Sequence, residues 1–182
     1  MMESSLIELL STEYIHNAID SDDNMPNLFE ESPYYNENEA IELLKHKHNA
    51  FSILSLNCQS LQAKFDQLKI YVETFVNSLC PFSIIALQET WLTENHDISL
   101  LQLEGYTLLH KPKSCIAHGG VALYLRGNHE YKMLTINSES NTWDGIFVEV
   151  VLNCSNFRNT QKIVIGNIYR PPRETVASYE LF

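Results

Sequence analysis

The spacing of apolar residues predicts a mixed α/β domain that begins near residue 51. Residues 51–57 (FSILSLN) and 83–89 (SIIALQE) are short, nearly continuous apolar runs, as expected for strands buried on both faces. Between them, Ser60 is a suitable helix N-cap, and the apolar residues after it recur at steps of three or four until Cys80-Pro81: Leu61, Phe65, Leu68, Val72, Phe75 and Leu79. Strand, helix and strand at this spacing predict a βαβ unit with parallel or neighbouring strands.

The rest of the domain is predicted to be rich in strands. Five segments with strand-forming residues are bounded by Gly, Asn, Ser or Pro, which favours hairpins that extend the same sheet. The segments are residues 105–111 (GYTLLHK), 120–126 (GVALYLR), 131–136 (YKMLTI), 145–152 (GIFVEVVL) and 162–169 (KIVIGNIY).

The N-terminal part of the chain has a different texture. Residues 1–20 carry apolar side chains at helical spacing, which predicts one amphipathic helix. Residues 20–39 mix acids, Asn, Ser and two prolines without a sustained period, as solvated linkers do. We therefore expect an acidic tail over residues 1–48 and a domain over residues 49–182.

Charge does not exclude a nucleic-acid substrate. The chain has 182 residues and a net charge of −11, which would repel a phosphate backbone if it were evenly spread. Residues 1–50, however, hold 11 acids and two lysines, so the remainder carries a charge of only −2. The acidity therefore describes the predicted tail more than the domain.

Cysteine placement and hydropathy indicate an intracellular protein. Four cysteines are widely spaced, with no Cys-x-x-Cys pair, so neither a zinc finger nor a disulfide framework is indicated. No apolar run is long enough to span a bilayer, and no basic residue precedes the first leucines as it would in a secretory signal.

Polar residues end three of the predicted strands. Asn57 closes the first, Glu89 closes the second, and Tyr169 closes the last before Arg170. In α/β sheets such residues tend to meet at one edge, where ligands bind. A carboxylate suits Mg²⁺, an amide can orient a phosphate, and a phenol can donate to a phosphate oxygen.

Four motifs at these strand ends resemble one family. LNCQSL around Asn57, ALQETWL around Glu89, HGGVALYL from His118 and GNIYRPP around Tyr169 are similar to motifs of the endonuclease/exonuclease/phosphatase superfamily. The residues of these motifs are most similar to those of the apurinic-like endonuclease domain of non-LTR retrotransposons (LINE, jockey or CR1 type). The resemblance extends over about residues 51–173.

The resemblance implies a fold and a chemistry. The fold would be a four-layer α/β sandwich of the DNase I-like type, here only in part, and the chemistry would be Mg²⁺-dependent hydrolysis of a DNA phosphodiester. Asn57 matches the family's first active-site asparagine, Glu89 its metal-binding glutamate and Tyr169 its phosphate-contacting tyrosine. Arg170 is a candidate for contact with the nucleic-acid backbone. A DNA substrate makes the nucleus one candidate compartment.

The chain departs from the family in its second half. The family's Gly-Asp-x-Asn motif and terminal Ser-Asp-His motif do not occur in the 182 residues. These motifs supply the aspartate that prepares the attacking water and the histidine that faces the phosphate. We therefore expect a truncated domain that is nearly or wholly inactive alone, since such groups act as a unit.

Two alternatives remain open at this stage. The chain could be a phosphatase-type or sphingomyelinase-like member of the same superfamily, or a non-catalytic scaffold that docks a protein partner through its N-terminal helix. Loss of one of the family's two sheets would also expose the apolar inner face of the other. That exposure predicts poor solubility or a partner that covers the face.

Overall fold

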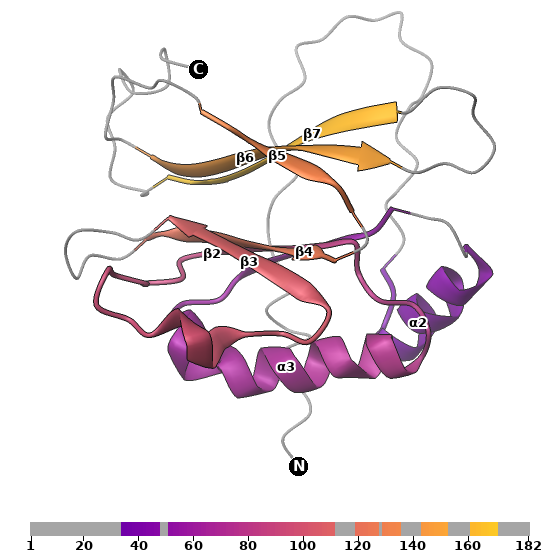
Figure 1. Cartoon of the computed structure of the whole chain (residues 1–182). Coiled ribbons are helices and arrows are strands. Elements are labelled where there is room, and N and C mark those ends of the chain that lie inside the picture. The colour runs from indigo at the N-terminus through magenta and orange to yellow at the C-terminus, as the bar shows by residue number, and fades with distance from the viewer. Residues whose placement is uncertain are drawn as a thin grey trace, which may run out of the picture.

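The computed structural model describes residues 34–47, 51–111, 119–127, 129–135, 143–152 and 161–170. Two β-sheets lie one above the other, and two helices lie on the side of the first sheet that faces away from the second (Figure 1). The prediction of a mixed α/β fold of the layered-sandwich type is confirmed.

The first sheet is built on the βαβ unit that the sequence predicts. Strands β1 (Ile53–Asn57) and β2 (Ile84–Gln88) are parallel neighbours, and helix α3 (Leu61–Asn77) connects them. The antiparallel strands β4 (Val121–Arg126) and β3 (Tyr106–Lys111) complete the order β1-β2-β4-β3. A 3₁₀ turn, η1 (Ile98–Leu101), precedes β3.

The second sheet corrects the prediction that all hairpins extend one sheet. Strands β5 (Tyr131–Leu134), β6 (Asp144–Leu152) and β7 (Gln161–Tyr169) form a separate antiparallel sheet in that order. The physical reason lies in β2 and β4, which are apolar on both faces and need cover on both. Helix α3 covers one face, and the second sheet covers the other.

This packing covers the inner face of β2 and β4, which was expected to be exposed. Ile84, Ala86 and Leu123 of the first sheet pack in one buried cluster with Val148 and Val150 of β6. All five side chains are at most 6% exposed. On β1, however, Ile53 is 47% exposed, so the expected exposure of the first strand is retained in part.

Helix α3 follows the predicted apolar stripe except at its end. The Ser60 hydroxyl accepts a hydrogen bond from the amide of Ala63, and one face of the helix is buried against the first sheet. Leu79 was expected to continue the stripe, but it is 90% exposed. The helix ends in a Schellman-type turn, in which the amides of Leu79 and Cys80 donate to the carbonyls of Val76 and Phe75. This turn directs Leu79 away from the core.

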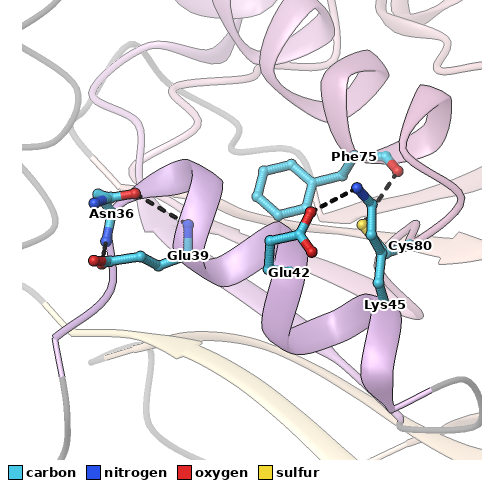
Figure 2. Close-up of polar contacts among 6 residues, drawn as sticks. All are labelled: Asn36, Glu39, Glu42, Lys45, Phe75 and Cys80. Atoms are coloured by element: carbon cyan, nitrogen blue, oxygen red, sulfur yellow. Dashed lines mark hydrogen bonds and ion pairs between the residues drawn. The ribbon is translucent and has the colours of Figure 1, made fainter.

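A second helix lies within the segment that was expected to be tail. Helix α2 (Glu37–His46) begins at a capping box, in which Asn36 and Glu39 exchange backbone and side-chain hydrogen bonds (Figure 2). Ile41 is buried in the same cluster as helix α3, so this part of the predicted tail belongs to the packed structure. The start of helix α2 was expected to be linker because the residues that cap the helix are polar. The amphipathic helix expected over residues 1–20 lies outside the described residues.

Figure 2 also shows how helix α2 approaches the end of helix α3. Lys45 forms an ion pair with Glu42 on helix α2, and the Cys80 thiol donates to the carbonyl of Phe75.

Within the described part of the chain, no helix is both long and apolar enough to cross a membrane.

Candidate functional site

The candidate site begins with a contact between the ends of two parallel strands. Asn57 is the last residue of β1 and lies opposite Gln88 in the register of β1 and β2. Glu89 follows Gln88 directly after β2. Its side-chain Oε1 accepts a hydrogen bond of 2.8 Å from Asn57 Nδ2. The structure thus brings the amide and the carboxylate together at the carboxyl edge of the sheet, as expected for a ligand site.

Tyr169 reaches this pair from the second sheet. It is the last residue of β7, and its phenol lies close enough to the Glu89 carboxylate for that charge to act on it. Burial first, and then the negative charge of Glu89, raise the pKa of Tyr169. The phenol therefore stays protonated at neutral pH and can donate a hydrogen bond. Asn57 and Tyr169 are 112 positions apart along the chain, and both lie next to Glu89.

The loops that hold the site contain unusual backbone conformations. Four non-glycine residues after β1 and β2 have positive φ angles: Gln59 at 44°, Ser60 at 84°, Glu89 at 52° and Trp91 at 54°. Such conformations cost about 1–2 kcal/mol for a residue with a Cβ atom. They are concentrated where Asn57 and Glu89 lie, and strain of this kind commonly accompanies functional sites.

Backbone hydrogen bonds keep these strained loops in place. The amides of Ser60 and Leu61 donate to the carbonyls of Glu89 and Thr90, which joins the loop after β1 to the loop after β2. The amides of Thr90 and Trp91 donate in turn to Gly120 and Gly119, just before β4. Glu89 is therefore held by its neighbours on both sides along the chain.

Asp144 is a site residue that the sequence analysis missed. It begins β6, lies opposite Tyr169 in the register of β6 and β7, and accepts a hydrogen bond from the Gly120 amide at 2.8 Å. Its charge contributes to the raised pKa of Tyr169. The available signal was its position at the start of a strand that pairs with the Tyr169 strand.

The Gly119-Gly120 pair serves this connection between the sheets. Gly120 has φ +82°, and a Cβ atom there would lie 2.8 Å from Thr90 Oγ1, so a side chain is excluded. Because the Gly120 amide already donates to Asp144, the pair has a structural role and is not a phosphate cradle.

Arg170 follows Tyr169 directly and is half-buried. It lies one residue beyond β7, at the end of the strand where Tyr169 lies. His118, the first residue of the quoted HGGVALYL motif, lies outside the described residues.

The donor set of the site fits magnesium. Mg²⁺ keeps several waters and typically takes only one or two carboxylates together with substrate phosphates. Glu89 supplies a carboxylate. Asn57 donates to this carboxylate through Nδ2, so its amide oxygen remains available to accept from or bind a ligand. Among the described residues, no three His, Cys, Asp or Glu side chains gather as a multidentate metal site requires.

The neighbouring thiol does not belong to this chemistry. Cys58 is largely buried, and burial raises its pKa to about 12. Its Sγ donates to the Gln88 carbonyl at 3.3 Å. A pKa this high keeps the thiol protonated at neutral pH, whereas the thiolate is the nucleophilic form.

Comparison with known proteins gives partial matches to solved structures. No protein-family model and no curated protein sequence matches the chain. The AP endonuclease LMAP from Leishmania major is 14% identical and covers 70% of this chain and 42% of its own, with a TM-score of 0.47. The APE2 catalytic domain from Xenopus laevis is 22% identical over 71% of this chain and 48% of its own, with a TM-score of 0.47.

A 3′ phosphatase from Neisseria, NExo, solved with a product DNA hairpin, is 17% identical, with a TM-score of 0.38. It covers 57% of this chain and 38% of its own. The chain thus spans less than half the length of each of these three proteins.

Proposed function

We propose that this chain forms the metal-binding and phosphate-binding part of a DNA phosphodiesterase of the endonuclease/exonuclease/phosphatase superfamily. The single observation that carries the proposal is the hydrogen bond from Asn57 to Glu89 at the carboxyl edge of the first sheet. Tyr169 lies near the same carboxylate. These three residues belong to motifs that resemble the endonuclease domain of non-LTR retrotransposons. We propose the same origin for this chain and, with a DNA substrate, an intracellular and nuclear setting.

The roles of the side chains follow from their chemistry. Glu89 would hold Mg²⁺, with the Asn57 amide keeping the carboxylate oriented through its hydrogen bond. When bound, the ion would neutralise charge on the scissile phosphate. Tyr169 keeps its proton at neutral pH and can donate it in a hydrogen bond to a phosphate oxygen. Arg170 is suited to contact with the DNA backbone.

The proposal includes a low hydrolytic rate for the chain alone. The 182 residues contain no Gly-Asp-x-Asn and no Ser-Asp-His, so no residue matches the family's water-activating aspartate or phosphate-facing histidine. General acid–base catalysis contributes about 10²–10⁴-fold, and residues that act as a unit lose more together. We expect metal and DNA binding to persist while hydrolysis is close to background.

Metal binding by the 182-residue chain tests the site directly. Titration with Mg²⁺ by calorimetry should show binding that Glu89→Gln weakens by at least about tenfold, since even outer-shell partners of metal ligands contribute that much. The matched control is Glu149→Gln, which removes a glutamate that pairs with Lys162 at the surface of the second sheet. This control should bind Mg²⁺ as the unchanged chain does, and equal binding by all three proteins would contradict the proposed site.

Nicking of supercoiled plasmid DNA in Mg²⁺ tests the catalytic part. We expect background nicking from the chain and from Glu89→Gln alike. Nicking that depends on Glu89 would support the phosphodiesterase assignment and contradict the expected need for the absent aspartate and histidine.

A further inference from the structure

A buried asparagine joins the two sheets next to the candidate site. Asn167 lies on β7 and is only 2% exposed. Its Nδ2 donates to the Leu87 carbonyl of β2 at 3.0 Å and to the Ala122 carbonyl of β4 at 2.9 Å. Its Oδ1 accepts a hydrogen bond from the Gln88 side chain. One amide therefore connects β7 to both central strands of the first sheet.

Packing alone does not require an amide at this position. The surrounding inter-sheet cluster is apolar, and an apolar side chain of similar size would fill the space without desolvating a polar group. Apolar contacts are non-directional, however, and allow one sheet to shift over the other. Hydrogen bonds from both amide protons to two different strands fix the place of β7 along the first sheet.

The fixed point lies close to the site on both sheets. Leu87 and Gln88 directly precede Glu89 along β2. Tyr169 is two residues after Asn167, and residues two apart in a strand project from the same face. The hydrogen bonds of Asn167 therefore fix β7 relative to β2 within two residues of both Glu89 and Tyr169.

We propose that Asn167 is a positioning residue that holds the Tyr169 phenol against the Glu89 carboxylate. The proposal rests on the proposed function for its catalytic meaning, because Tyr169 and Glu89 are the phosphate-side and metal-side groups of that site. Its structural content concerns the ligand-free chain and is tested there.

The test is a mutant cycle read by carbon NMR of the full 182-residue chain. All tyrosines carry ¹³C at Cζ, and the Tyr169 signal is identified as the one that Tyr169→Phe removes. Glu89→Gln should displace this signal, because the phenol loses a neighbouring negative charge. In Asn167→Leu, the Tyr169 signal should already be displaced, and adding Glu89→Gln should produce no further change.

A matched control separates positioning from general loss of packing. Val150 is fully buried in the same inter-sheet cluster, but it pairs with Tyr131 and Ile163, away from the site end of β6. In Val150→Ala, Glu89→Gln should displace the Tyr169 signal as in the unchanged chain. A displacement of the same size in Asn167→Leu as in the unchanged chain overturns the proposal.

A second variant keeps the test decisive if Asn167→Leu does not fold. Gln88→Met removes the donor to Asn167 Oδ1 at a half-buried position and leaves both backbone contacts of Asn167 in place. The effect of Glu89→Gln on Tyr169 should be smaller in this variant, and an unreduced effect contradicts the proposal. Absence of Mg²⁺ binding would count against the proposed function and leave this result unchanged.

Discussion

Shortening Leu123 to alanine tests whether the second sheet is docked on the first. Leu123 is fully buried near the middle of β4, and it packs in the inter-sheet cluster with Val148 and Val150 of β6. Removing a buried leucine side chain to the β-carbon costs about 2–5 kcal/mol, depending on how far the cavity relaxes. Sheet-on-sheet packing leaves little room to collapse, so we expect Leu123→Ala to lower the free energy of unfolding by about 3 kcal/mol.

Such a loss is large for a domain of this size. Typical single domains are stable by about 5–15 kcal/mol, so the variant would retain only part of its stability at room temperature. Urea unfolding followed by tryptophan fluorescence measures the change as a lower midpoint with an unchanged slope. An unchanged slope matters because it shows that the same surface is exposed on unfolding.

The matched control lies on the opposite side of the molecule. Ile70 is 66% exposed on helix α3, so Ile70→Ala should change the free energy of unfolding by less than about 0.5 kcal/mol. A loss below about 1 kcal/mol for Leu123→Ala would refute the reasoning, because it would mean that this face of β4 is not packed. The original expectation of an exposed inner face would then return.

Two further variants test the turn after helix α3 and a buried phenol of the first sheet. Leu79 has φ 61° after helix α3 and is exposed, so Leu79→Gly should raise the free energy of unfolding by about 0.5–1 kcal/mol in urea titrations, and a loss would contradict the role of backbone strain. Burial raises the pKa of Tyr106 to about 12, and its hydroxyl donates to the Phe82 carbonyl at 2.8 Å. The folded chain therefore keeps this proton after the unfolded chain loses it near pH 10, so the contribution is complete below pH 10 and is lost between about pH 10 and 12. Tyr106→Phe should flatten the fall in stability across that window, and an equally steep fall would contradict the assignment.

The sequence was most informative where a single periodicity dominated. Residues 61–75 carry one apolar stripe and a serine cap, and the helix forms there because that stripe has one sheet face to cover. Asn57 and Glu89 could be placed together because parallel strands of a βαβ unit end at the same edge. Neither inference depends on contacts between distant segments.

The division into two sheets could not be read from strand patterns. A hairpin such as β5 and β6 has the same local sequence whether it extends a sheet or begins another. What decides is the total apolar area of β2 and β4, which is buried on both faces only if a second layer covers them. Asn167 shows the same limit, because its polar side chain inside a strand pattern has meaning only through Leu87 and Ala122 of the other sheet.

The candidate site depends on the inter-sheet packing more than on its own loops. Glu89 adopts a left-handed conformation that is unfavourable by about 1–2 kcal/mol, and Tyr169 lies on a different sheet, so neither group finds the other through local structure. Three polar links cross between the sheets near this point: Tyr169 to Glu89, Asp144 to Gly120, and Asn167 to the central strands. Docking of the second sheet, driven by apolar burial, therefore brings Tyr169 to the end of the first sheet where Glu89 lies.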